Sequence, residues 1–178
     1  MKKFLKTTYN DIVVYWRPEL SGGGLSYGQQ FIPVTKKLFG KVKRIHEFCA
    51  GPGFIGFSLL ANGLCDTLCL SDINPEAIKA MKLTVKKNRL EDKVDIYLSD
   101  GLKNIPEYEK WDLVVSNPPH FSYDVGRGII ATDPKWNLHK NFYLNVHKFM
   151  YKSSNILIQN NYFGSQEKDF KKYFKSGN

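Results

Sequence analysis

The feature of this sequence that most constrains its fold is a regular alternation, between residues 44 and 159, of short apolar segments with segments of helical spacing. Short apolar runs are typical of buried strands, whereas Ala77, Ile78, Met81 and Val85 recur on one helix face. Pro75 suits the first turn of that helix. The expected strands are 44–49, 67–71, 94–98, 111–116 and 155–159. The expected helices are 29–39, 54–62, 75–88, 136–151 and 166–174.

Strands that alternate with helices in this way predict βαβ units. We therefore expect an α/β, Rossmann-like, doubly wound sheet that is mainly parallel, with helices on both faces. The length of 178 residues is typical of one domain. The prediction is a single domain over 1–178, in which an N-terminal arm and cofactor-lid segment (1–43) precede the Rossmann-like core (44–178). The arm is expected to be irregular before its glycine-containing turn.

Composition narrows the class of protein further. The longest apolar runs fall well short of the roughly 18 residues that a membrane-spanning helix needs. Lys6, Thr7 and Thr8 interrupt any apolar stretch behind the basic N-terminus, so we expect neither export nor membrane association. Three cysteines without paired histidines favour reduced thiols and no metal site. These features predict a cytoplasmic protein.

The net charge of +9 is unevenly distributed. Residues 1–45 contain nine Lys and Arg against two acidic residues, and residues 135–178 contain eight against two. The middle of the chain, 46–134, contains nine against thirteen. Two interpretations stay open: the basic ends contact a polyanion such as RNA, or they form an ordinary solvated lysine surface.

A glycine-rich turn follows the first expected strand of the core. Gly51, Gly53 and Gly56 form a GxGxxG pattern, with small residues where a ligand would touch the backbone. Asp72 stands nineteen residues after Gly53 at the end of the next strand, where a carboxylate can accept both hydroxyls of a ribose. Dinucleotide dehydrogenases share this pattern, so it predicts a nucleoside-containing cofactor without naming it.

Two further strand ends carry polar residues. Asp100, in the segment Ser99-Asp100-Gly101-Leu102, is placed to meet an adenine amino group. The fourth strand ends at Asn117-Pro118-Pro119-His120. In open α/β sheets ligands bind beyond the carboxyl ends of the strands, so these segments should surround one site.

From about residue 44 to 159 the chain resembles the class I S-adenosylmethionine-dependent methyltransferases that carry an Asn-Pro-Pro-aromatic motif. Members of this group methylate planar nitrogens, such as the glutamine amide of release factors or ribosomal protein and the exocyclic amines of adenine or guanine. The resemblance implies S-adenosyl-L-methionine as the cofactor. It assigns the catalytic role to Asn117, Pro118, Pro119 and His120. It assigns cofactor binding to Glu47, Cys49, Ala50, Gly51, Gly53, Asp72, Ile73, Asp100, Gly101, Leu102 and Asn117.

The chain departs from the family pattern in three places. Cys49 stands where a glycine is usual, and His120 replaces the usual Tyr or Phe, with Phe121 following it. The chain also continues for only one helix beyond the fifth strand, whereas the family adds two strands. We therefore expect either missing C-terminal strands or a sheet edge covered by another chain or by the N-terminal arm.

The chemistry of planar nitrogens explains the motif independently. Their lone pair is delocalised, so they are poor nucleophiles. The Asn117 side-chain oxygen and the Pro118 carbonyl can accept the two N–H bonds and draw the nitrogen towards tetrahedral geometry. Asn is no base near neutral pH, so the motif suits an acceptor that needs no deprotonation before methyl transfer.

The sequence therefore predicts an N-methyltransferase whose acceptor is ribosomal RNA or a translation-related protein. A small-molecule or peptide natural product is the alternative acceptor. A catalytically silent cofactor-binding module and a nicotinamide-dependent oxidoreductase are the rival functions. Arg127 and Trp136, which flank the loop after the motif, are candidate substrate contacts. The oligomeric state is left open.

Overall fold

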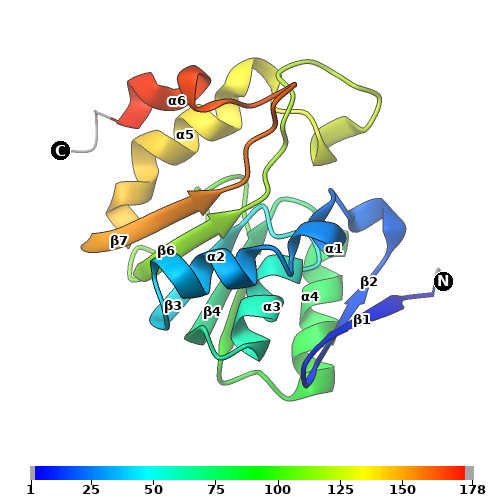
Figure 1. Cartoon of the computed structure of the whole chain (residues 1–178). Helices are drawn as coiled ribbons and strands as arrows, with labels where there is room; N and C mark the ends of the chain where they lie inside the picture. The colour runs from blue at the N-terminus through cyan, green and yellow to red at the C-terminus, as the bar shows by residue number, and fades with distance from the viewer. Residues whose placement is uncertain (1–2, 175–178) are drawn as a thin grey trace.

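The computed structural model describes residues 3–174, and a five-stranded sheet lies at its centre (Figure 1). All four strand pairings are parallel. The chain winds outwards from the middle strand in one direction and then in the other, which places the topological switch point between β3 and β6. The doubly wound sheet predicted from the sequence is confirmed. Its strands, from edge to edge, are β5 (Val94–Leu98), β4 (Cys65–Asp72), β3 (Val42–Phe48), β6 (Trp111–Ser116) and β7 (Met150–Ile158).

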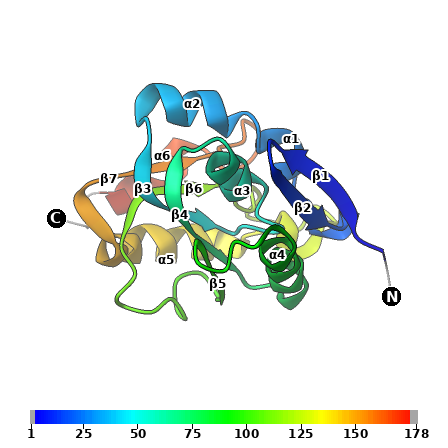
Figure 2. The same ribbon diagram turned by 90° about the horizontal axis from the view of Figure 1, so that it is seen from below.

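Helices cover both faces of the sheet, as Figure 2 shows from below. Helices α2 (Phe31–Leu38), α3 (Phe54–Ala61) and α4 (Pro75–Asn88) share one core with Ile45 and Leu68. Helix α5 (Asn137–Asn145) packs on the other face with Phe48 and Trp111. Helix α6 (Glu167–Phe174) packs in turn on α5. No helix within residues 3–174 is long and apolar enough to cross a membrane.

Helix α4 begins and ends where its sequence signals place it. Asn74 is the N-cap, and its side-chain oxygen accepts the Glu76 backbone N–H at 3.0 Å, while Pro75 occupies the first turn. Lys86 and Lys87 lie in the last turn, where positive charge is favourable. Such local signals explain why the predicted bounds of this helix agree with the structure.

The N-terminal arm differs from the irregular segment that we expected. Strands β1 (Leu5–Tyr9) and β2 (Ile12–Trp16) form an antiparallel hairpin. Asn10, between them, adopts a positive φ of 48°, a conformation that Asn tolerates well in a tight hairpin turn. The side chains of Tyr9, Ile12 and Val14 enter the core of α3 and α4. The hairpin is therefore part of the core.

The helix expected over 136–151 is shorter in the structure. Helix α5 ends at Asn145, the 3-10 turn η4 (Val146–Phe149) follows, and β7 already begins at Met150. Phe149 stacks on Trp111 with ring centroids 5.0 Å apart, and Met150 pairs with Trp111 in the sheet. Tertiary contacts with β6 thus override the helical spacing of this segment.

In the described part of the chain, 3–174, β7 is an edge strand of the sheet. The hairpin β1–β2 packs on α3 and α4, so it does not cover the outer edge of β7. Within residues 3–174 no strand pairs with that edge. The hairpin therefore does not provide the coverage of this edge that the sequence suggested as one outcome.

Candidate functional site

A cavity of about 1270 Å³ lies at the carboxyl ends of the strands. Its volume lies slightly above the range of about 300–1,000 Å³ that is typical of small-ligand pockets. Of the residues that the sequence assigned to the site, Gly53, Pro118 and His120 do not line it. Those that do are Glu47, Cys49, Ala50, Gly51, Asp72, Ile73, Asp100, Gly101, Leu102, Asn117 and Pro119.

The turn between β3 and α3 forms one wall of the cavity. Cys49, Gly51 and Gly53 all adopt a positive φ, of 57°, 54° and 83° respectively. Cys49 therefore holds a backbone conformation that favours glycine, which explains why glycine is the usual residue there. Gly53 serves packing, because a Cβ built on it would lie 2.7 Å from the Phe57 ring. The turn exposes the Gly51 backbone to the cavity while Gly53 fixes the start of α3.

Glu47 is buried beneath this turn at the end of β3. Its carboxylate accepts the Gly56 backbone N–H at 2.7 Å and the Ile55 N–H at 3.3 Å. Burial raises the pKa of Glu47 to about 8, although the two backbone hydrogen bonds oppose the shift. The side chain thus anchors the first turn of α3 and also lines the cavity.

Asp72 lies across the cavity floor at the end of β4. One carboxylate oxygen accepts the Gly51 N–H at 2.7 Å, and the other accepts the Asn74 N–H at 2.8 Å. Burial raises the pKa of Asp72, and these backbone hydrogen bonds offset part of the shift. A carboxylate has about four lone-pair sites, so Asp72 can order the glycine turn and still accept a hydrogen bond from a ribose hydroxyl.

The segment after β5 also lines the cavity. Buried Ser99 accepts the Asn104 N–H through Oγ at 3.0 Å, which fixes the turn that carries Asp100 and Leu102. Ile73, whose side chain is exposed, and Leu102 both line the cavity. Two apolar side chains beside an exposed carboxylate suit a flat heterocycle that carries an amino group.

The side chain of Asn117, after β6, is held at both ends. Its Nδ2 donates to the Gly22 carbonyl at 3.3 Å, and its Oδ1 lies 2.8 Å from His120 Nε2. The Gly22 carbonyl can only accept, which places the amide nitrogen towards it and the amide oxygen towards His120. His120 must then donate from Nε2.

A neutral His120 ring completes this network. Burial lowers the pKa of His120 to about 4, so near neutral pH the ring carries one proton. With that proton on Nε2, Nδ1 accepts from the hydroxyl of buried Ser165, 2.8 Å away. A directed chain therefore runs from Ser165 through His120 to Asn117. Nothing in the sequence pattern linked Ser165 to the motif.

Two other segments border the cavity. Leu20, Gly22 and Gly24, from the expected lid, line it, and a Cβ built on Gly22 would contact Ile130. Ile130 belongs to the loop 121–133, which an isolated bridge between Phe121 and Thr132 closes. The N-terminal segment and the loop after the motif therefore meet over the site.

The two candidate substrate contacts in this region have different surroundings. Arg127 is exposed and lines the cavity. Trp136 does not line it, and its ring instead packs edge-on against His139 and Phe170. Trp136 thus belongs to the contact between α5 and α6. Within residues 3–174 no cluster of side chains suits a metal ion.

A Rossmann-like sheet with this cavity at its switch point is the architecture of class I methyltransferases, as the resemblance implied. The model of the methyltransferase small domain family matches residues 27–135, more than half of the chain. The chain belongs to this family.

Two curated relatives of the chain are named as methyltransferases. The chain is 40% identical over 83 residues to a release factor glutamine methyltransferase from Clostridium acetobutylicum, covering 46% of this chain and 29% of that protein. It is 28% identical over 151 residues to ribosomal RNA small subunit methyltransferase C from Haemophilus influenzae, covering 79% of this chain and 44% of that protein. The chain thus spans less than half the length of either relative.

A solved structure shares the fold over almost the whole chain. It is a 16S rRNA N2 methyltransferase from T. thermophilus in complex with AdoMet and guanosine, with a TM-score of 0.71 at 14% identity. The match covers 96% of this chain and 45% of that protein. At this identity the likeness supports the fold alone.

Proposed function

We propose that this protein transfers a methyl group from S-adenosylmethionine to a planar amide or exocyclic amine nitrogen of ribosomal RNA or of a translation-related protein. The observation that carries the proposal is the Asn117 amide, held at the cavity wall with its oxygen end fixed by His120. Membership of the methyltransferase small domain family supports the reaction class.

The residues around the cavity fit the methyl donor. The volume of about 1270 Å³ accommodates a nucleoside with an amino-acid tail and leaves room for part of an acceptor. Asp72 offers lone pairs to the ribose hydroxyls, and Ile73 and Leu102 would contact the adenine, with Asp100 near its amino group. The Cys49–Gly53 turn would receive the methionine end above Glu47.

Bound in this orientation, the donor would supply a methyl group activated on a sulfonium sulfur. The chain's own contribution is to position the acceptor nitrogen. The oxygen of Asn117 has one lone pair beyond the His120 hydrogen bond and can accept an N–H from the acceptor. The Pro118 carbonyl, the second acceptor expected from the sequence, does not line the cavity, so this contact is assigned to Asn117 alone. The Asn117 amide is fixed before the reaction, which is electrostatic preorganisation rather than acid–base catalysis.

The surroundings of Asn117 favour nitrogen as the acceptor atom. An alcohol or thiol must lose its proton to a base, and Asn117 cannot take one. His120, its direct neighbour, donates from Nε2 and has Nδ1 engaged by Ser165. An amide or aromatic amine can instead lose its extra proton after the methyl transfer.

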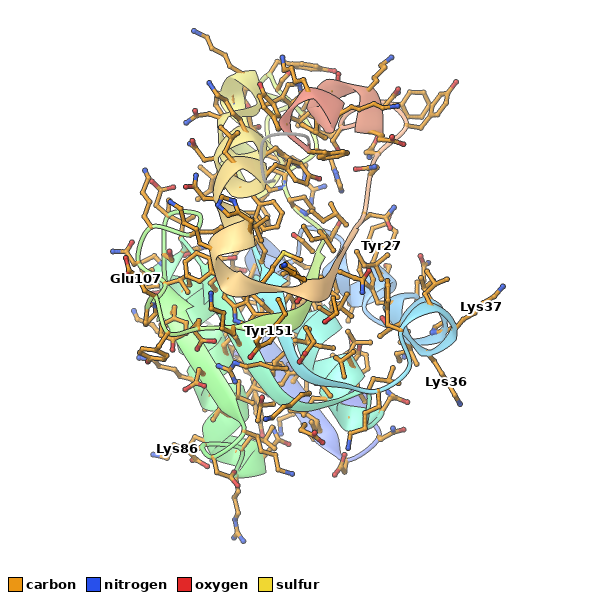
Figure 3. The ribbon with its side chains drawn as sticks, turned by 90° about the vertical axis from the view of Figure 1, so that its left-hand side faces the viewer. Tyr27, Lys36, Lys37, Lys86, Glu107 and Tyr151 are labelled. Atoms are coloured by element: carbon orange, nitrogen blue, oxygen red, sulfur yellow. The ribbon has the colours of Figure 1, made fainter. Side chains whose placement is uncertain are left out.

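The names of the two curated relatives support both acceptor classes, since one names a release factor and the other ribosomal RNA. Exposed lysines lie on several sides of the molecule: Lys36 and Lys37 on α2 and Lys86 on α4 point away from it in different directions (Figure 3).

Incubation with labelled methyl donor and fractionated cell extract tests the proposal. Label in RNA or in a translation-related protein supports it, and the absence of label from both contradicts it.

A further inference from the structure

Two neighbouring aromatic rings project from the turn after β7. Tyr162 is 82% exposed and Phe163 is 83% exposed, and their ring centroids lie 5.2 Å apart at right angles. Rings of this size rarely remain in water side by side, and contiguous exposed apolar surface often marks an interaction site. Hydrophobic packing within residues 3–174 does not account for the pair.

Hydrogen bonds within the turn hold the backbone that carries these rings. The Asn161 N–H donates to the Ser165 carbonyl at 2.9 Å, and the Asn161 side-chain oxygen accepts the Phe163 N–H at 2.9 Å. The Gln166 side chain donates to the Tyr162 carbonyl at 2.6 Å. A turn closed by these hydrogen bonds loses little conformational entropy when its rings bind a partner.

The same turn packs directly on the Asn-Pro-Pro motif. Gly164 lies so close to the His120 carbonyl that a Cβ at this position would overlap it, and Ser165 bonds the His120 ring. A Cβ at Gly164 would also lie 3.3 Å from the Phe121 ring, and that ring meets the ring of Tyr123 edge-on at 5.9 Å. Tyr123 is 62% exposed. We call the exposed rings of Tyr123, Tyr162 and Phe163 the aromatic rim.

Basic side chains on α6 and in the loop of Tyr123 indicate the kind of partner that would bind the rim. Exposed Lys168, Lys171 and Lys172 follow on α6, and exposed Arg127 lies in the loop of Tyr123 and lines the cavity. Acidic residues are fewer here: Asp124 bonds the Gly126 N–H, Asp169 bonds the Gln166 N–H, and Glu167 is exposed. Aromatic rings beside basic side chains are the combination that binds unpaired nucleotides, because every base can stack on a ring and the phosphates meet the cations.

We propose that the aromatic rim is a stacking platform for unpaired bases of an RNA acceptor, adjoining the motif that receives the target nitrogen. This inference rests on the proposed function and selects RNA as the substrate class. The platform would hold bases that flank the target while the target itself enters the cavity beside Asn117. A fully paired duplex, whose bases are stacked on each other, would not bind there.

The test uses the full chain and a fluorescently labelled single-stranded RNA of mixed sequence, with its complementary duplex for comparison. Tyr162→Ala/Phe163→Ala should weaken single-strand binding at least tenfold, because base stacking is lost. Tyr162→Phe/Phe163→Tyr keeps both rings and should bind like the wild type. Tyr151→Ala is the matched control: this tyrosine is 52% exposed, lies near the start of β7 (Figure 3), and should not matter.

Unchanged RNA affinity in the double alanine variant would overturn the platform, as would equal affinity of the wild type for the duplex. Weakened binding of a glutamine-containing peptide, without any effect on RNA, would also overturn it in favour of a protein acceptor. Affinity for S-adenosylhomocysteine is measured in parallel and should be equal in all variants. A wild type that fails to bind S-adenosylhomocysteine contradicts the proposed function, whichever result the RNA gives.

Discussion

Nε2 of His120 lies 2.8 Å from Oδ1 of Asn117, and Nδ1 of the same ring lies 2.8 Å from the Ser165 hydroxyl. The residue that replaces the usual aromatic of the motif is therefore hydrogen-bonded through both ring nitrogens. Its edge orients the amide that would hold the acceptor nitrogen. We infer that His120 is a positioning residue in this protein.

Replacement of His120 tests this role. His120→Phe keeps a ring but loses the donor to Asn117, so kcat should fall about five- to tenfold, the cost of one neutral hydrogen bond of about 1 kcal/mol. Affinity for S-adenosylhomocysteine should stay within about twofold. His120→Gln, whose amide can donate to Asn117, should recover part of kcat. A variant that loses cofactor affinity and kcat together would indicate a structural role instead.

Asp72 should dominate cofactor affinity. Asp72→Ala removes a charged acceptor from the ribose and releases the Gly51 and Asn74 N–H groups. Binding of S-adenosylhomocysteine should weaken by about 2–3 kcal/mol, measured by calorimetry. Asp66→Asn, at an exposed carboxylate that pairs with Lys41, is the control and should bind normally. Unchanged affinity in Asp72→Ala would remove the central support for the cofactor site.

The sheet and most of its helices could be predicted because local signals and burial agree there. Helix α4 has a cap, a first-turn proline and one apolar face, and the strands β4 and β6 contain buried apolar runs at 68–70 and 113–115. The hairpin β1–β2 was missed although Asn10-Asp11 stands between two β-branched and aromatic segments, a recognisable turn signal. The early end of α5 could not be predicted, because it depends on Phe149 and Met150 meeting Trp111 on a distant strand.

The residues that line the cavity at the strand ends could be predicted from the sequence, whereas their contacts with residues of other loops could not. Parallel topology alone brings Asp72, Asp100 and Asn117 to one edge of the sheet, so most of the assigned residues line the cavity. The contacts of Gly22 and Ser165 with the motif span 95 and 45 residues of sequence. Such contacts arise from the packing of loops, for which no local pattern exists.

Two glycines, Gly53 in the turn before α3 and Gly63 after α3, provide a stability prediction and its control. Gly53 and Gly63 both have positive φ, of 83° and 67°, but a Cβ on Gly53 would meet the Phe57 ring while Gly63 faces open space. Gly63→Ala should lower the free energy of unfolding by about 1 kcal/mol through backbone strain. Gly53→Ala should lower it by about 2–4 kcal/mol because close packing adds to the strain. Equal losses in chemical denaturation would contradict the packing role of Gly53.

Acid should destabilise the protein through His46. Burial, and then the nearby charge of Arg44, lower the pKa of His46 from 6.5 to about 3. Above pH 6.5 the ring is neutral in both the folded and the unfolded state. As the pH falls from 6.5 towards 3, only the unfolded state gains the proton, so up to about 1.4 kcal/mol of stability is lost per pH unit.

His46→Gln abolishes this proton uptake, so its free energy of unfolding should fall less steeply on acidification than that of the wild type. The comparison between variant and wild type removes the opposite contribution of Glu47, whose raised pKa favours the folded state at low pH. Parallel pH dependences of the two proteins, measured by urea denaturation, would show that His46 does not titrate as proposed.

The most direct test of the central claim locates the transferred methyl group by mass spectrometry of the modified acceptor, comparing the wild type with Asn117→Ala. We predict a methyl group on an amide or exocyclic amine nitrogen in the wild type. Asn117→Ala should yield no product and keep nearly normal affinity for S-adenosylhomocysteine, because its contacts serve the acceptor in the transition state. A methyl group on oxygen, sulfur or carbon, or full activity in Asn117→Ala, would contradict the account.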